Sequence, residues 1–216
     1  DVVILCVGLD ETLEGEEGDT GNSYASGDKR DLLLPESQRK LMEAIAETGK
    51  PVVLCLMAGS DIDLSYAAEH FDAVLQLWYP GSEGGKAAAQ VLFGEVSPSG
   101  KLPVTFYESL EELPEFTDYR MEGRTYRYMK GKAQYPFGYG LTYGNVSVTG
   151  AEVTVRSDGS IVVSAEAENT GVATDEVLQV YVENTDWGRA GKHPELCGFL
   201  RIHLKEGEKA CFEIPV

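Results

Sequence analysis

Four carboxylates crowd into one short stretch near the start of the chain, LEGEEGD at residues 13–19. Each ionised carboxylate disfavours ionisation of its neighbours, so crowding raises the pKa values of the group. A carboxyl group that keeps its proton near neutral pH can act as a general acid, which glycosidic bond hydrolysis needs because the sugar oxygen leaves poorly until protonated. The competing interpretation, favoured by composition alone, is a solvated acidic loop. The residues concerned are Glu14, Glu16, Glu17 and Asp19, with Gly15 and Gly18 allowing tight turns between them.

This acidic stretch follows an apolar run, VVILCV at residues 2–7, that predicts a buried strand. In open α/β sheets, ligands bind beyond the carboxyl ends of the strands, which is where the stretch would lie. Trp78 and Tyr79 end a later apolar run and could stack on a sugar ring at the same rim, or equally anchor the strand end in the core. Arg124 lies in GRTYRY and could line a sugar subsite, although structural bracing is favoured for this motif.

Other kinds of site are disfavoured by their motifs. GSEGGKAAA has the context of a phosphate loop, but Pro80 occupies the position of the first Walker glycine. The acidic stretch lacks the residue ladder of a calcium-binding EF-hand, and the histidines lack zinc-ligand spacing, so we expect neither a metal nor another cofactor. Cys6 and Cys55 lie inside apolar runs and are expected to be buried thiols. Free thiols slightly favour a reducing compartment such as the cytoplasm and leave secretion open.

The composition also restricts the partners. The 216 residues include 36 Asp and Glu against 18 Lys and Arg, which gives a formal net charge of −18. Phosphate backbones and anionic lipids repel such a chain, so we expect no nucleic-acid or membrane partner. No apolar run approaches the roughly 20 residues of a membrane helix. Because the sequence opens directly on a predicted core strand, we expect it to be a piece of a longer protein.

Two hydrophobic patterns divide the chain. Residues 1–106 alternate short apolar runs with helical stretches, which predicts an α/β domain with a mostly parallel sheet flanked by helices. Residues 107–144, rich in Tyr, Pro and Gly, are interpreted as an ordered connecting segment. In residues 145–216 the period becomes two, with turn signals between the runs, which predicts an immunoglobulin-like all-β sandwich. The sequence stops inside a predicted strand, so we expect this sandwich to be incomplete.

Several stretches in this order resemble the carboxyl-terminal α/β sandwich domain of glycoside hydrolase family 3. They are DVVILCVGLDETLEGEEGD, DKRDLLLPESQRKLMEAI, GKPVVLCLMAGSDIDLSYA, WYPGSEGG, FGEVSPSGKLPVTF, GRTYRYM and YPFGYGLTY. The tail, with ENTGVATDEVLQVYVEN and HPELCGFLRIHLKEGE, resembles the fibronectin type III-like domain that follows in that family. The resemblance covers essentially the whole chain.

The resemblance implies part of a retaining exo-β-glycosidase acting on terminal non-reducing β-linked sugars, with β-xylosidase favoured and β-glucosidase next. In that family a TIM-type barrel, which is missing here, carries the aspartate nucleophile, and the α/β sandwich supplies the glutamate acid/base. The family xylosidase pattern, laid on GLDETLEGE without a gap, puts the acid/base at Glu16. Other branches place it directly before a glycine, which would select Glu17. Glu14 would then tune the pKa of the acid or contact the sugar.

The expected partners are therefore β-linked oligosaccharides and the barrel domain of the same enzyme, while homo-oligomerisation is left open. The sequence departs from the family pattern at TGNSYASG, which separates the acidic stretch from DKR where an Asp-Arg pair usually follows directly. An alternative from another class is a non-catalytic carbohydrate-binding or interaction module of the same fold.

Overall fold

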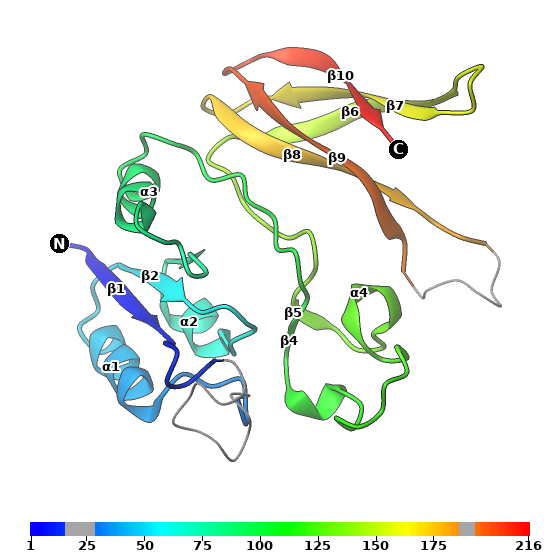
Figure 1. The fold of residues 1–216 in the computed structure, drawn as a ribbon. Helices are drawn as coiled ribbons and strands as arrows, with labels where there is room; N and C mark the ends of the chain where they lie inside the picture. The colour runs from blue at the N-terminus through cyan, green and yellow to red at the C-terminus, as the bar shows by residue number, and fades with distance from the viewer. Residues whose placement is uncertain (16–28, 186–192) are drawn as a thin grey trace. The chain divides into compact units, whose positions relative to one another are not determined.

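The structure is a computed structural model that describes residues 1–15, 29–185 and 193–216 (Figure 1). The chain divides into two compact units, each built from three stretches of sequence. The first unit holds residues 1–88, 105–115 and 131–135, and the second holds residues 89–104, 116–130 and 136–216. The division of the sequence at 1–106, 107–144 and 145–216 stays a prediction.

A parallel three-stranded sheet in the order β1-β2-β3 forms the centre of the first unit. Hydrophobic runs on β1 and β2 meet in register, with Leu5 beside Leu54 and Val7 beside Leu56. The predicted α/β arrangement is confirmed, because helices lie between these parallel strands in the chain, as the crossover connections of a parallel sheet require. The elements are β1 (Val3–Gly8), α1 (Glu36–Ala46), β2 (Val52–Met57), α2 (Ser65–His70), β3 (Ala73–Gln76) and α3 (Gly84–Leu92).

The core of the first unit lies around the central strand β2. Leu54 and Leu56 are fully buried there, and Cys55 is buried as expected. Cys6 is exposed, so the expectation of a buried thiol at this position was wrong. Side chains alternate along β1, an edge strand, and Leu5 and Val7 take the buried positions while Cys6 lies on the opposite face, where the edge strand is exposed.

Short elements follow in residues 106–135. Strand β4 (Phe106–Tyr107) pairs antiparallel with β5 (Ala133–Tyr135) in the first unit. Between them lie the 3₁₀ helix η2 (Leu110–Glu112) and the one-turn helix α4 (Thr125–Tyr128). Among the residues that the structure describes, no helix has the length and apolar character needed to cross a membrane.

The second unit contains two antiparallel sheets, which confirms the predicted all-β architecture of the tail. One sheet has the order β10-β7-β6 and the other pairs β8 with β9. The predicted alternation is confirmed by the buried cluster of the unit, which consists of Ala165, Ala167, Leu178, Ile202, Leu204 and Ile214. The strands are β6 (Val146–Val155), β7 (Ile161–Asn169), β8 (Thr174–Val182), β9 (Glu195–Leu204) and β10 (Lys209–Pro215).

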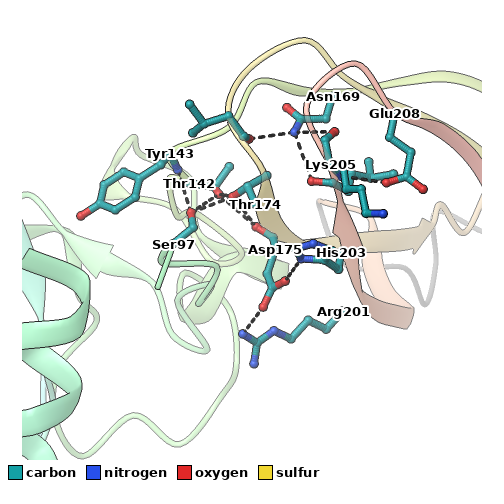
Figure 2. A network of polar contacts seen from close by, with 12 residues as sticks. Ser97, Thr142, Tyr143, Asn169, Thr174, Asp175, Arg201, His203, Lys205 and Glu208 are labelled. Carbon is teal, nitrogen blue, oxygen red and sulfur yellow. Dashed lines mark hydrogen bonds and ion pairs between the residues drawn. The ribbon is translucent and has the colours of Figure 1, made fainter. Parts of the chain in front are cut away.

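A polar network closes one end of these strands (Figure 2). The Ser97 hydroxyl accepts hydrogen bonds from the Tyr143 amide at 3.0 Å and the Thr174 hydroxyl at 2.7 Å, and it contacts the Thr142 hydroxyl at 2.8 Å. Asn169 is fully buried and joins five backbone groups. Its amide nitrogen donates to the carbonyls of Val172, Leu204 and Lys205, and its oxygen accepts from the amides of Asn145 and Gly171. The turn at residues 169–171, NTG in the sequence, is therefore fixed by a buried side chain.

Candidate active site

The candidate site lies at the carboxyl edge of the parallel sheet in the first unit. Strands β1, β2 and β3 end at Gly8, Met57 and Gln76, and parallel strands present these ends at one edge. The Gln76 side-chain nitrogen donates to the Ala58 carbonyl at 2.9 Å, which ties the ends of β2 and β3 together. The loops after the three strands supply the residues described below.

Glu14 is held at this edge by its own loop. Its amide donates to the Asp10 carbonyl at 2.9 Å, while the Asp10 carboxylate accepts from the Thr12 amide at 3.0 Å and the Thr12 hydroxyl at 2.6 Å. Such a carboxylate-to-amide contact two residues on is the Asx-turn that Asp favours. Residues 10–14 therefore form an ordered turn. This turn fixes the backbone position from which the Glu14 side chain extends.

Two neighbouring loops hold the carboxylate of Glu14. Its Oε2 atom accepts hydrogen bonds from the Tyr79 hydroxyl at 2.6 Å and from the Gly59 amide at 3.1 Å. Burial alone would raise the pKa of Glu14, but the neighbouring Ser60 side chain, these two hydrogen bonds and the positive charge of Lys29 hold the pKa below its usual value. Burial and the contact with Glu14 raise the pKa of Tyr79 to about 12. Glu14 is therefore an ionised acceptor at neutral pH, and Tyr79 is a neutral donor.

The contact between Glu14 and Tyr79 depends on a glycine at position 59. A Cβ atom at Gly59 would lie 2.7 Å from the Tyr79 ring atom Cε2 and 3.4 Å from Glu14 Oε2. A side chain at position 59 would therefore displace the tyrosine ring. The close approach explains why the β2–α2 loop has a residue without a Cβ at position 59.

Trp78 and Tyr79 have different environments although they are adjacent. Trp78 is half-buried and packs edge-to-face against Phe106 with ring centroids 6.3 Å apart, so it anchors the strand end. Its φ angle of 56° lies in the left-handed region, which is costly for a bulky residue and is a kind of strain that concentrates at functional sites. Tyr79 is 51% exposed and presents its ring at the sheet edge. The predicted sugar contacts of both residues stay predictions.

Arg124 belongs to the second unit, where its guanidinium donates to the Asp118 carbonyl at 2.9 Å. The neighbouring Tyr126 stacks on Phe137 and accepts a hydrogen bond from the Leu196 amide at 3.1 Å. Arg127 forms an ion pair with Glu195. The GRTYRY motif therefore braces the second unit through its neighbouring residues, and a sugar contact for Arg124 stays a prediction.

The structure adds two charged residues that motif analysis missed. Lys29 donates from its ammonium to the Asp61 carbonyl at 2.6 Å, and burial lowers the pKa of this lysine. The Asp61 carboxyl accepts from the Tyr107 amide at 2.7 Å, and its other oxygen is buried without a partner among the described residues. Burial raises the pKa of Asp61 to about 6. The signal that could have found Asp61 is its place in GSDID, directly after the second predicted strand.

Glu16 and Glu17, the two candidates for the acid/base, lie outside the described residues. In the sequence they follow Glu14 by two and three positions.

Comparison with known proteins gives one family for most of the chain. Residues 1–143 match the sequence model described as the Glycosyl hydrolase family 3 C-terminal domain. A xylan 1,4-beta-xylosidase from Xylanibacter ruminicola is 42% identical over 211 residues, which are 96% of this chain and 24% of that protein. A periplasmic beta-glucosidase from Salmonella typhimurium is 34% identical and matches 100% of this chain and 29% of its own length.

Solved structures also match this chain over its whole length. A beta-glucosidase from Kluyveromyces marxianus has a TM-score of 0.82 at 29% identity, and the match covers 100% of this chain and 26% of that chain. A beta-D-glucoside glucohydrolase from Trichoderma reesei has a TM-score of 0.87 at 23% identity, which shows the shared fold. The chain thus spans about a quarter to a third of the proteins that it matches.

Proposed function

Since this chain belongs to glycosyl hydrolase family 3, whose C-terminal domain model matches residues 1–143, we propose that it is part of a retaining exo-β-glycosidase. The enzyme would remove terminal non-reducing β-linked sugars, and this chain would supply the general acid/base. A TIM-type barrel elsewhere in the same protein would supply the aspartate nucleophile. The proposal fits a chain that covers 24% and 29% of two relatives named as a β-xylosidase and a β-glucosidase.

The observation that carries the proposal is the anchoring of Glu14 at the carboxyl edge of the sheet by Tyr79 and Gly59. Glu14 has a lowered pKa, so it is unsuited to be the proton donor and suited to accept a hydrogen bond from a sugar hydroxyl. The proton donor is then a later carboxyl group of the acidic stretch. We assign it to Glu16, two residues after the anchor, with Glu17 as the alternative.

In the proposed reaction the barrel aspartate attacks the anomeric carbon while Glu16 protonates the departing oxygen. The resulting glycosyl-enzyme is a covalent intermediate. Glu16, now a carboxylate, removes a proton from water, and the hydroxide attacks the anomeric carbon to release the sugar and free the aspartate. Tyr79, half exposed beside Glu14, and Arg124 are proposed to contact the sugar, and Trp78 to support the rim beneath it.

The sugar is proposed to be xylose, with glucose as the alternative. The acidic stretch fits the xylosidase form of the family pattern, and the relative at 42% identity is named a xylan 1,4-beta-xylosidase.

The proposal is tested by Glu16→Ala in the complete enzyme, with Glu17→Ala and the exposed Glu69→Ala as comparisons. Loss of a general acid should slow substrates with poor leaving groups by about 100-fold or more, because acid–base catalysis contributes roughly 10²–10⁴-fold. Dinitrophenyl glycosides need little protonation and should cleave with a much smaller loss in the first step. Azide should partly restore the rate, since it attacks the glycosyl-enzyme without needing a base. If Glu16→Ala leaves every rate unchanged and Glu17→Ala shows this pattern, the role belongs to Glu17.

A further inference from the structure

Two cysteines lie side by side in the parallel sheet of the first unit. Cys6 on β1 and Cys55 on β2 are partners in the register of these strands. Partner positions place their side chains on the same face of the sheet, and neighbouring strands lie about 4.8 Å apart. Disulfides form between cysteines whose Cα atoms are about 4.4–6.8 Å apart. The register alone therefore brings the two thiols within bonding range.

The two thiols are in contact but differ in their access to solvent. Burial and the contact with Cys6, which includes a hydrogen bond between the side chains, raise the pKa of Cys55 to about 11. Cys55 is 1% exposed, so a dissolved reagent cannot reach it directly. Cys6, on the edge strand β1, is exposed. The pair therefore combines a thiol that reagents can reach with a covered thiol behind it.

The other two cysteines of the chain lie in the second unit and have different neighbours. The Cys197 thiol donates to the Val180 carbonyl at 3.3 Å. Cys211 on β10 lies opposite Glu166 on β7. Because Cys211 is exposed like Cys6 but has a glutamate as its register partner, it provides a matched comparison for the reactivity of Cys6.

We propose that Cys6 and Cys55 form a reversible thiol–disulfide site whose oxidant is a small-molecule disulfide. The Cys6 thiolate attacks one sulfur of the reagent, whose S–S bond breaks and releases one half as a thiol. The Cys55 sulfur gives its proton to water and attacks the Cys6 sulfur, which releases the second half. The two cysteines are oxidised to one disulfide, and the reagent is reduced to two thiols that take up the two protons.

The environments of the two thiols set the order of these steps. Only Cys6 can begin the exchange, because Cys55 is covered. The second step is the slower one, since Cys55 is mostly protonated at neutral pH and the thiolate is the nucleophile. The exposure of Cys6 also leaves the finished bond open to a reducing thiol, and exposed disulfides are the easily reduced ones.

The test treats the complete enzyme with cystamine, a cationic disulfide that suits a chain with a net charge of −18. Acid stops the exchange, and the peptides are mapped by mass spectrometry without reduction. Cys6 should be recovered mainly as a cross-link to Cys55, whereas Cys211 should carry a cysteamine adduct. Treatment with dithiothreitol should restore the free thiols at all three positions.

Cys55→Ala removes the second thiol and keeps a small apolar side chain in the core. In this variant the fraction of Cys6 that carries the cysteamine adduct should rise about 10-fold or more, because no thiol remains to displace it. Cys211→Ser removes an exposed thiol elsewhere and should leave the yield of the link between Cys6 and Cys55 unchanged.

Two results overturn the inference. If Cys6 of the wild type keeps the adduct to the same extent as Cys211, Cys55 does not reach it. If Cys6 stays a free thiol throughout, it is covered in the complete enzyme and cannot begin the exchange. Circular dichroism identifies a Cys55→Ala variant that fails to fold, and the presence or absence of the link in the wild type then decides alone.

Discussion

Two carboxyl groups on neighbouring loops of the sheet edge have pKa values shifted in opposite directions. Glu14 accepts hydrogen bonds from Tyr79 and Gly59, and together with the Ser60 side chain and the charge of Lys29 these outweigh its burial and lower its pKa. Asp61 receives one from Tyr107 and keeps a buried oxygen without a partner among the described residues, so burial dominates and raises its pKa to about 6. Two carboxyl groups whose pKa values are shifted in opposite directions have different protonation states at the same pH. At pH 5, Glu14 is ionised and Asp61 is mostly protonated.

The raised pKa of Asp61 predicts a pH-dependent stability difference for Asp61→Asn. The folded protein binds the Asp61 proton more tightly than the unfolded chain, whose value is near 3.8, so the wild type loses stability as pH rises from about 4 to about 6. Asparagine cannot ionise and avoids this loss. Relative to wild type, the variant should gain about 1–2 kcal/mol in free energy of unfolding between pH 4 and pH 7.5, a figure reduced for the partial exposure of the group. Urea denaturation at both pH values measures the difference.

Asp158→Asn serves as a control of opposite sign. Hydrogen bonds from the Ser160 hydroxyl and amide lower the pKa of Asp158, so its contribution to stability appears above about pH 4 and is lost as pH falls through the lowered value. This variant should therefore lose stability relative to wild type as pH rises through the lowered value to about pH 4, so it is also measured below pH 4, and the difference should stay nearly constant from there to pH 7.5. A constant difference for Asp61→Asn across the pH range would show that Asp61 is ionised throughout.

At the residue scale, the sequence predicted side chains that stand out by residue type and missed those that meet through a backbone group. Glu14 and Tyr79 were singled out from a charge cluster and an aromatic pair, and they are hydrogen-bonded in the structure. Lys29 and Asp61 lie 32 positions apart and meet through a backbone carbonyl. A backbone acceptor leaves no mark on residue type, so no spacing rule could have found this contact.

Among the strands, the alternation of apolar and polar residues predicted the strands that have one face in the core. Ala165 and Ala167 on β7 and Ile202 and Leu204 on β9 are buried at every second position, as the period requires. Strand β6 was not predicted. It is an edge strand whose valines, among them Val153 and Val155, are mostly exposed, and its register shifts beside Gly150. An edge strand without a buried face and with a bulge carries little periodic signal.

The connections between these strands depend on Asn169, which predicts a large effect of Asn169→Ala. The substitution removes hydrogen bonds to five backbone groups around a fully buried position, and alanine can replace none of them. Leaving several buried groups unpaired should cost about 3 kcal/mol or more in free energy of unfolding. Ser147→Ala, at an exposed position of β6, should change it by less than about 0.5 kcal/mol. Equal effects of the two variants in urea denaturation would show that the backbone holds this turn without the asparagine.

At the scale of the whole molecule, we propose that the chain is one part of a larger catalytic arrangement. It spans 24% of one relative and 29% of another, and the nucleophile is proposed to lie on a barrel outside it. Its described residues include an ionised Glu14 and a Tyr79 donor at one sheet edge. These groups can form hydrogen bonds with a sugar, and hydrolysis with retention also requires a proton donor and a nucleophile on the opposite face of the sugar ring.

Residues 1–216 alone should therefore show no turnover of aryl β-xylosides or β-glucosides, while the complete enzyme hydrolyses at least one of them. Half of a shared site should also bind xylobiose and cellobiose weakly, because few of the contacts to the sugar come from this chain. Isothermal titration of the isolated chain with both disaccharides measures this directly. Millimolar or weaker dissociation constants agree with the acid/base role, whereas micromolar binding without turnover by the complete enzyme would identify a carbohydrate-binding module. In that case Glu14 and Tyr79 would act as ligands for a retained sugar, and Tyr79→Phe would weaken binding by about 3- to 10-fold through the loss of one hydrogen bond.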